Sequence, residues 1–197
     1  RYWNVPFCRV QIEFMRQPRS CWNINLIISY YERDRIILCN ECCQDSHIAE
    51  KIREKLGHKE VEMIMIEKAW QNDFQAYDNL IVGASTWFDG ELPTYWDEMI
   101  PEIESLDLKD KKVALFGLGD QIGYPDNFVD GLGILADAFE KAGAILVGFT
   151  SAEGYSFNHS RALRDAKWCG LVIDIENQSK LTDKRIADWC EQLKKEF

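Results

Sequence analysis

Short apolar runs alternate with helical patterns from Ser46 to the end of the chain. A short apolar run bounded by turn residues is typical of a buried strand. The runs predict strands over residues 61–66, 78–83, 112–116, 144–149 and 170–174. The segments between them predict helices over residues 48–56, 96–106, 128–142 and 181–196. Because strands that alternate with helices form a parallel sheet covered on both faces, the chain is predicted to be α/β.

The first of these helices has recognisable ends. Ser46 is a residue type that caps helix N-termini, and Gly57 is a residue type that ends helices. Ile48, Ile52 and Leu56 are spaced four apart and form one apolar stripe. We therefore expect a helix that starts after Ser46 and packs this stripe on the sheet.

Two glycine-rich loops follow neighbouring strands, and each holds one prominent aromatic residue. The first is GASTWFDGELP (residues 83–93) with Trp87, and the second is GLGDQIGYPDNF (residues 117–128) with Tyr124. Loops at the carboxyl ends of parallel strands are where open α/β sheets bind ligands. Either the two side chains are ordinary packing aromatics, or they hold a flat ring between them, and the paired loops favour the ring.

The two loops resemble the flavin loops of flavodoxins, and the resemblance covers roughly residues 48–197. It implies a flavodoxin-like, doubly wound sheet of five parallel strands in the order 2-1-3-4-5. The last strand is expected to be split by an inserted loop of about twenty residues, as in long-chain members. The loop either contacts a partner or is a solvated loop that completes the sheet edge. The resemblance also implies FMN as cofactor and assigns it these residues: Ser85, Thr86, Trp87, Phe88, Asp89, Gly90, Gly119, Asp120, Gly123, Tyr124 and Asn127.

By the same resemblance, the chain is an electron carrier that moves one electron at a time and is not an enzyme. Its expected partners are redox proteins such as a ferredoxin–NADP reductase, photosystem I or nitrogenase. A flavin-dependent quinone reductase is the alternative enzyme class, but no second motif for a substrate pocket is present, and we expect a monomer. A flavodoxin-like interaction protein without cofactor is the other alternative.

The phosphate loop is where the chain departs from the family. Gapless register places this loop on residues 40–45, which are Asn40, Glu41, Cys42, Cys43, Gln44 and Asp45. The family's hydroxyl residues are missing, and Cys43 replaces a glycine that allows close backbone approach. Glu41 and Asp45 are expected to bring negative charge towards a phosphate, at about 3–4 kcal/mol per pair if the separation is ~4–6 Å. The loop is therefore predicted to weaken FMN binding.

Residues 1–45 differ in character from residues 46–197. They hold five of the seven cysteines (Cys8, Cys21, Cys39, Cys42 and Cys43), and the first lysine of the chain is Lys51. Residues 23–31 and 35–39 could each be a strand and supply strand 1. The segment is either a diverged N-terminus or the product of an altered reading frame or misassigned start. The predicted boundary between segment and flavodoxin-like domain lies near Ser46.

Charge and cysteine content limit which classes of partner and which cellular compartment are expected. With 33 acidic and 23 basic residues, the net charge is −10, which argues against nucleic-acid binding and favours a basic docking surface on the partner. No apolar run reaches the ~18 residues of a membrane span, and no signal-peptide pattern is present. We therefore expect a cytoplasmic protein with free thiols. Cys39, Cys42, Cys43, Cys21 and His47 lack the spacing of a regular zinc site, so no metal site is assigned.

Overall fold

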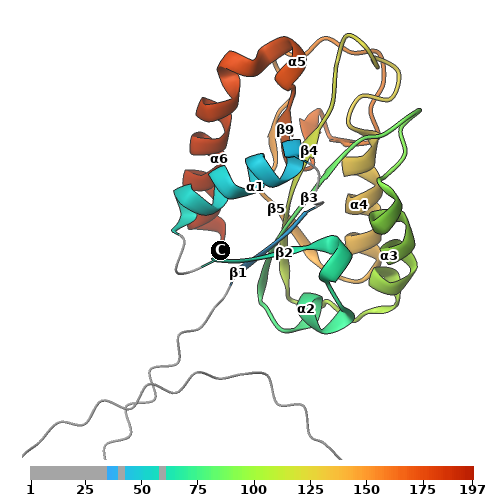
Figure 1. The fold of residues 1–197 in the computed structure, drawn as a ribbon, viewed down its shortest axis with the longest axis vertical. Coiled ribbons are helices and arrows are strands. Elements are labelled where there is room, and N and C mark those ends of the chain that lie inside the picture. The colour runs from blue at the N-terminus through green and yellow to red at the C-terminus, as the bar shows by residue number, and fades with distance from the viewer. Residues whose placement is uncertain (1–34, 40–42, 58–60) are drawn as a thin grey trace, which may run out of the picture. The chain divides into compact units, whose positions relative to one another are not determined.

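The computed structural model describes residues 35–39, 43–57 and 61–197. These residues form a central parallel sheet in the order β2-β1-β3-β4-β5 (Figure 1). The strands are β1 (Arg35–Cys39), β2 (Val61–Met65), β3 (Asn79–Ser85), β4 (Lys112–Leu118) and β5 (Ile145–Val147). The expected fold class and strand order are confirmed.

The last strand position of the sheet is shared by two short strands. β5 pairs with the first half of β4, and β9 (Leu171–Ile173) pairs with its second half. Residues 148–170 separate them, and we call this segment the insertion. It contains a small antiparallel sheet of β6 (Thr150–Ser151), β7 (Leu163–Arg164) and β8 (Lys167–Trp168). The predicted split of the last strand is therefore confirmed.

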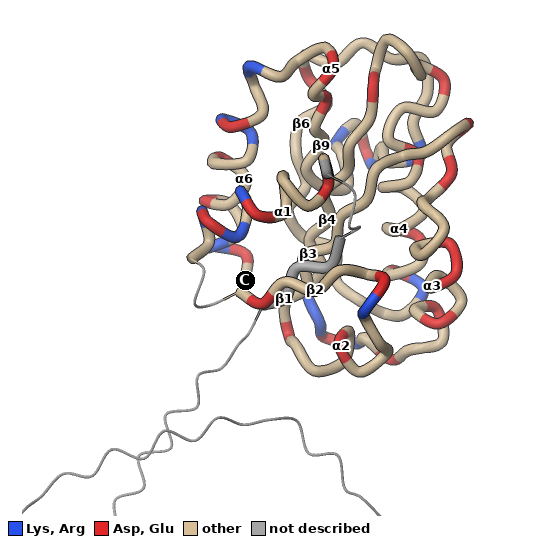
Figure 2. The backbone as a smooth tube through the Cα atoms, in the orientation of Figure 1, with Lys and Arg blue, Asp and Glu red and all other residues tan. Residues whose placement is uncertain are grey.

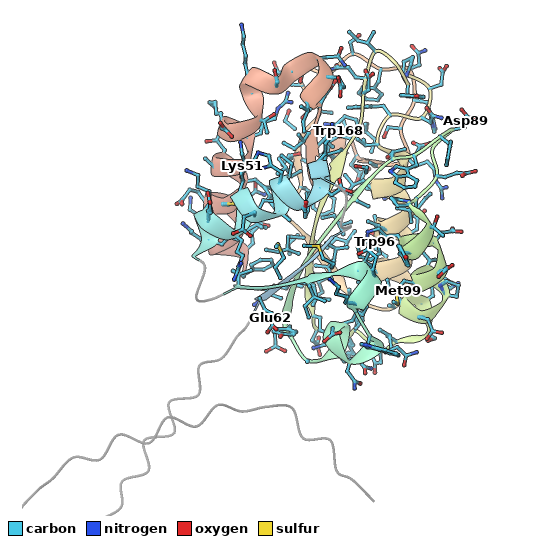
Figure 3. The ribbon with its side chains drawn as sticks, viewed as in Figure 1. Lys51, Glu62, Asp89, Trp96, Met99 and Trp168 are labelled. Carbon is cyan, nitrogen blue, oxygen red and sulfur yellow. The ribbon has the colours of Figure 1, made fainter. Side chains whose placement is uncertain are left out.

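Helices cover both faces of the sheet (Figure 1). On one face, α1 (Cys43–Leu56) and α6 (Thr182–Glu196) bury Ile52 and Trp189 against Ile81 and Phe116. On the other, α3 (Thr94–Ser105) and α4 (Asp130–Lys141) pack against the alternate residues of β3 and β4. Figure 3 shows Trp96 on this second face, where its indole N–H donates to the Gly83 carbonyl at 3.2 Å. The alternation of the strand side chains thus creates two apolar layers.

The start of α1 differs from the expectation. The helix begins at Cys43, so Ser46 lies inside its first turns and is not the N-cap residue. Asp45 occupies the first turn, where the partial positive charge of the helix N-terminus stabilises an acidic side chain. The pattern of capping residues missed this because Asp45 is held by a residue forty positions away, as described below.

Several other boundaries were shifted. β3 and β4 extend to Ser85 and Leu118, which brings the strand ends directly to the two aromatic loops. α4 begins at Asp130, after Val129 takes a left-handed conformation with φ of 51°. Sequence patterns missed the short helices η1 (Ile66–Lys68), α2 (Gln71–Gln75), α5 (Ile175–Gln178) and η2 (Ser179–Leu181).

The predicted strand over residues 23–31 lies outside the described residues, whereas residues 35–39 form β1. The boundary near Ser46 remains a prediction, and the sheet already includes β1 on its N-terminal side. Across the described residues, the helices are too short or too polar to span a bilayer. Cys169 and Cys190 are buried free thiols, and burial raises the pKa of each to about 12.

Candidate functional site

A cavity of about 450 Å³ lies at the carboxyl ends of β3 and β4. Residues from five segments line it: the start of α1, the two aromatic loops, the end of β4 and the start of α5. They are Gln44, Ser85, Thr86, Trp87, Leu118, Gly119, Asp120, Tyr124, Ile175 and Glu176. The parallel topology brings these segments together because the strand ends meet at one edge of the sheet.

Trp87 sits at the base of a tight turn. Its backbone N–H donates to the Glu91 carbonyl at 2.8 Å, and the Glu91 N–H donates back to the Trp87 carbonyl at 2.8 Å. The turn closes because Phe88 and Gly90 adopt positive φ values of 44° and 98°. Figure 3 shows Asp89 at the tip, away from the sheet. The indole is 40% exposed, so the turn presents a partly open aromatic face at the cavity.

The Trp87 turn is fixed to the sheet and to α4. The Thr86 N–H donates to the Leu118 carbonyl at 3.1 Å, which continues the β3–β4 pairing by one residue. The Thr86 hydroxyl accepts from the Gly131 N–H at 3.1 Å. These bonds hold the residue before Trp87 between a strand and a helix.

The second loop is organised around the Asp120 carboxylate. It accepts from the N–H groups of Gly123 at 2.8 Å and Ile122 at 3.0 Å, and from the Asn177 side-chain amide at 2.7 Å. Chiefly through the Gly123 N–H, these hydrogen bonds lower the pKa of Asp120, although desolvation acts in the opposite direction. The Tyr124 N–H donates to the Asp120 carbonyl at 2.9 Å, and the Tyr124 ring is 54% exposed. The loop thus has a fixed backbone and an accessible ring.

A buried carboxylate supports this loop from behind. Asp174 is fully buried and accepts from the Gln121 side-chain amide at 2.6 Å and from the Asn177 N–H at 2.9 Å. Asp174 is also the N-cap of α5, which supplies Ile175 and Glu176 to the cavity. The same side chain therefore positions the second loop and the start of α5.

At the α1 end of the cavity, Asp45 is fully buried and bonded to β3. Its carboxylate accepts from the Ser85 hydroxyl at 2.6 Å and from the Ser85 N–H at 3.2 Å. Gln44, the preceding residue, lines the cavity, whereas Asp45 does not. The carboxylate expected to face a phosphate instead joins α1 to the end of β3.

The structure brings seven of the predicted site residues into the lining of this cavity, namely Gln44, Ser85, Thr86, Trp87, Gly119, Asp120 and Tyr124. The remainder of the two loops lies next to the lining, in the turns that shape it: Phe88, Asp89, Gly90, Gly123 and Asn127. Asn40, Glu41 and Cys42 lie outside the described residues, as does the side chain of Cys43.

Sequence reasoning missed Leu118, Ile175 and Glu176 as lining residues. Leu118 could have been found from its place directly before Gly119 at a strand end. For Ile175 and Glu176 the available signal was Asp174, an N-cap residue type that directly follows an apolar run.

The surroundings of the cavity are acidic. Exposed carboxylates lie on both loops and on α5, and Figure 2 shows acidic positions along the loops at this end of the sheet. They are Asp89, Glu91, Asp126 and Glu176. In the part of the chain that the structure describes, no group of three or more His, Cys, Asp or Glu side chains could hold a metal ion.

Comparison with known proteins agrees with this geometry. The family model described as flavodoxin matches residues 45–189. The chain belongs to the flavodoxin family. It is 45% identical over 150 residues to a flavodoxin from Nostoc sp., covering 76% of this chain and 88% of that protein. It is 41% identical over 148 residues to a flavodoxin from Haemophilus influenzae, covering 75% of this chain and 85% of that protein.

The fold also matches a flavodoxin of known structure. The crystal structure of Fusobacterium nucleatum flavodoxin bound to flavin mononucleotide superimposes with a TM-score of 0.78 at 31% identity. The match covers 83% of this chain and 97% of that protein. Since the family model includes both aromatic loops, the resemblance drawn from them is confirmed.

Proposed function

We propose that the chain binds FMN with its ring system between Trp87 and Tyr124 and carries single electrons between redox proteins. Flavodoxins are electron-transfer proteins and not enzymes, and the chain is one of them. The observation that carries the proposal is the cavity into which two partly exposed aromatic side chains project from neighbouring loops. Aromatic faces of this kind stack on flat heterocycles and bury a large area.

The ring end of the cavity fits a flavin. Trp87 and Tyr124 supply aromatic faces, Leu118 and Ile175 supply apolar surface, and the loop glycines allow the backbone to approach the ligand. By the resemblance, the backbone of Phe88–Gly90 and of Gly123–Asn127 completes this end.

The α1 end fits an anion through the backbone of the helix. α1 has fourteen residues, and its N-terminus lies at the cavity through Gln44. Unpaired N–H groups and the helix dipole at such a terminus attract a phosphate. Because the Asp45 carboxylate bonds to Ser85, it occupies hydrogen-bond donors of β3 and is not itself part of the lining.

The bound flavin would supply the one-electron chemistry. The residues around it would set the ease of reduction. Asp89, Glu91, Asp120 and Glu176 place negative charge around the cavity, which opposes added negative charge on a ligand there. Trp87 and Tyr124 would exclude water from both ring faces. These effects together favour a carrier of low reduction potential.

The proposed partners are redox proteins with basic docking surfaces, of the ferredoxin–NADP reductase, photosystem I or nitrogenase kind. The net charge of −10 and the acidic rim support this, since complementary charge accelerates encounter. We further propose that the protein acts as a monomer in the cytoplasm, and that residues 1–45 are an atypical N-terminal segment that supplies strand 1 of the flavodoxin-like sheet.

Titration of the apoprotein with FMN tests the proposal. We expect quenching of flavin fluorescence to a saturating 1:1 end point, and a yellow holoprotein that accepts electrons from NADPH only when a reductase is added. Absence of quenching would exclude the carrier and favour an interaction protein without cofactor. Steady NADPH oxidation by the protein alone, stimulated by a quinone, would instead support a flavin enzyme.

A further inference from the structure

The first turn of α4 lies between the Trp87 turn and the insertion, and it contacts both. Two of its residues are glycines, Gly131 and Gly133, although glycine is unfavourable inside a helix. A Cβ atom at Gly131 would lie 3.2 Å from the Thr86 hydroxyl oxygen. A Cβ atom at Gly133 would lie 2.4 Å from the Arg161 carbonyl carbon. The helix backbone therefore approaches both segments more closely than a side chain would allow.

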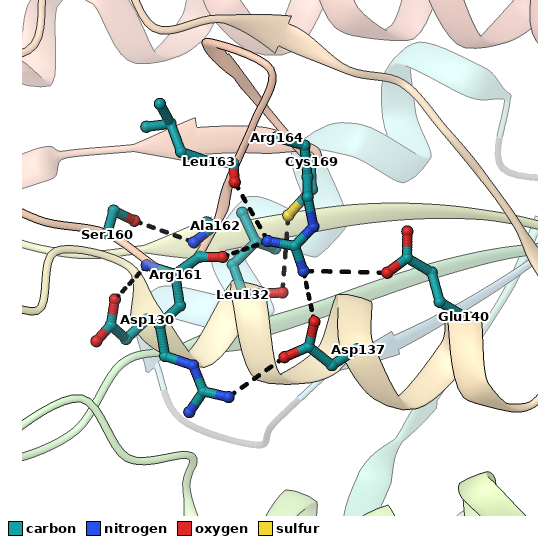
Figure 4. A network of polar contacts seen from close by, with 10 residues as sticks. All are labelled: Asp130, Leu132, Asp137, Glu140, Ser160, Arg161, Ala162, Leu163, Arg164 and Cys169. Carbon is teal, nitrogen blue, oxygen red and sulfur yellow. Dashed lines mark hydrogen bonds and ion pairs between the residues drawn. The ribbon is translucent and has the colours of Figure 1, made fainter.

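Asp130 connects these two segments through its carboxylate. Oδ1 accepts from the Arg161 backbone N–H at 2.7 Å, as Figure 4 shows. On the other side, a Cβ atom at Gly90 would lie 3.0 Å from Asp130 Oδ2, so the corner of the Trp87 turn approaches this carboxylate with no room for a side chain between them. Asp130 is 7% exposed, and its position is therefore set by the segments that it touches.

We infer that Asp130 is a positioning residue through which the insertion holds the Trp87 turn in place. Arg161 fixes the carboxylate from the insertion, and the carboxylate supports Gly90, which in turn sets the direction of Trp87. The insertion thus contributes to flavin binding although no residue of it lines the cavity among the described residues. This inference rests on the proposed function only in its last step.

A second contact between α4 and the insertion provides a control. Asp137, seven residues further along α4, pairs with Arg161 at 3.2 Å and with Arg164 at 2.5 Å (Figure 4). It holds the same insertion but lies more than one helical turn away from the Trp87 turn. Loss of Asp137 loosens the arginine side chains and leaves the Arg161 N–H bond to Asp130 intact.

The test is hydrogen exchange of the full-length apoprotein, followed at the N–H groups of Gly90 and Glu91, both of which donate to the Trp87 carbonyl. In Asp130→Ala we expect exchange at these two sites to rise about tenfold, the equivalent of one lost buried hydrogen bond. Asp130→Asn keeps an oxygen acceptor for the Arg161 N–H and should stay within about twofold of the parent. Asp137→Ala should leave both sites unchanged.

Titration with FMN then tests whether the position of the Trp87 turn affects flavin binding. Asp130→Ala should weaken FMN binding about tenfold, with rescue by Asp130→Asn. Unchanged exchange in Asp130→Ala, or an equal rise in Asp137→Ala, would overturn the inference, even if the parent binds FMN normally. If the parent binds no FMN, the proposed function fails, and the exchange data still decide whether Asp130 holds the turn. If the alanine variant does not fold, Asp130→Ser is the substitute, because its shorter side chain cannot reach both contacts.

Discussion

The two ends of the cavity are built in different ways. At the ring end, each aromatic residue sits on a turn closed by hydrogen bonds between residues no more than four apart, as in Trp87 with Glu91 and Asp120 with Tyr124. At the α1 end, the decisive contact joins Asp45 to Ser85, forty residues apart in the chain. The turns of the ring end therefore close locally and are supported from a distance by Asp174 and Asn177, whereas the contact that defines the α1 end is itself a tertiary one.

This difference explains why an aspartate has a different role at each end of the cavity. Asp120 is partly exposed and uses its own loop's N–H groups, so it shapes a turn. Asp45 is fully buried and satisfies a hydroxyl and an N–H at a strand end. A buried polar group that loses its partner costs more than an exposed one, so changes at Asp45 should act mainly on stability and changes at the ring end on binding.

The largest expected effect is at Trp87. Trp87→Ala should weaken FMN binding about a hundredfold, because stacking and burial of a ring of this size contribute a few kcal/mol. Riboflavin should be weakened to a similar degree, since the ring and not the phosphate makes the contact. Fluorescence titration measures both. Trp70→Ala is the control, because Trp70 is 77% exposed and precedes α2, at the opposite end of the sheet (Figure 1). Equal dissociation constants for the two variants would show that Trp87 does not contact the flavin.

At the α1 end, Asp45→Ala should lower the free energy of unfolding by about 1–3 kcal/mol, because it leaves the partly buried Ser85 hydroxyl and N–H without this acceptor. Urea unfolding of the apoprotein followed by circular dichroism measures the loss. The double variant with Ser85→Ala should lose less than the sum of the two single variants. Strict additivity would show that the Asp45–Ser85 contact contributes nothing to stability.

Replacement of residues 40–44 by Ser-Asp-Thr-Gly-Asn, with Asp45 retained, sharpens the same comparison. FMN binding should tighten about tenfold, because two hydroxyl donors and a glycine that allows close backbone approach are gained, while position 41 keeps a carboxylate. Riboflavin binding should stay the same, since it has no phosphate. An equal gain for both ligands would mean that the replacement acts through folding and not at the phosphate.

The smallest expected effect concerns Asp120. Since its pKa is lowered in the folded protein, it stabilises the fold at pH values above the ordinary carboxyl pKa of 3.8, and this contribution is lost as the pH falls through the lowered value. In Asp120→Asn, the free energy of unfolding should therefore fall less than in the parent as the pH drops below about 4. The difference should be no more than ~0.5 kcal/mol, because the group is partly exposed. Urea unfolding at pH 7 and pH 3 measures this. An equal loss of stability between pH 7 and pH 3 in the parent and in Asp120→Asn would contradict this expectation.

Sequence patterns were sufficient for the elements whose signal is local. The apolar runs located the strands, and the two loops located Trp87, Tyr124 and the family, because turns and short strands depend mostly on neighbouring residues. The split last strand followed from the resemblance to long-chain flavodoxins, in which two apolar runs lie on either side of a polar segment as they do here.

Helix starts and the inner contacts of the site could not be obtained in this way. α1 starts four residues earlier than the capping pattern indicates, since Asp45 is satisfied by Ser85. α4 starts after a left-handed Val129 because Phe128 and Val129 pack against Gly119. Ile175 and Glu176 reach the cavity only because β9 pairs with the end of β4.

The sequence by itself determined an acidic α/β chain with two aromatic loops at neighbouring strand ends, because periodicity and turn chemistry are properties of short stretches, and the resemblance of those loops indicated the flavodoxin family. Only the tertiary structure decided which carboxylates face the cavity and which are buried as supports. Asp45, Asp130 and Asp174 are each paired with groups more than thirty residues away or on another element, as Ser85, Arg161 and Gln121 show. A buried carboxylate is stable only where such donors meet it, and the folded chain alone brings them together.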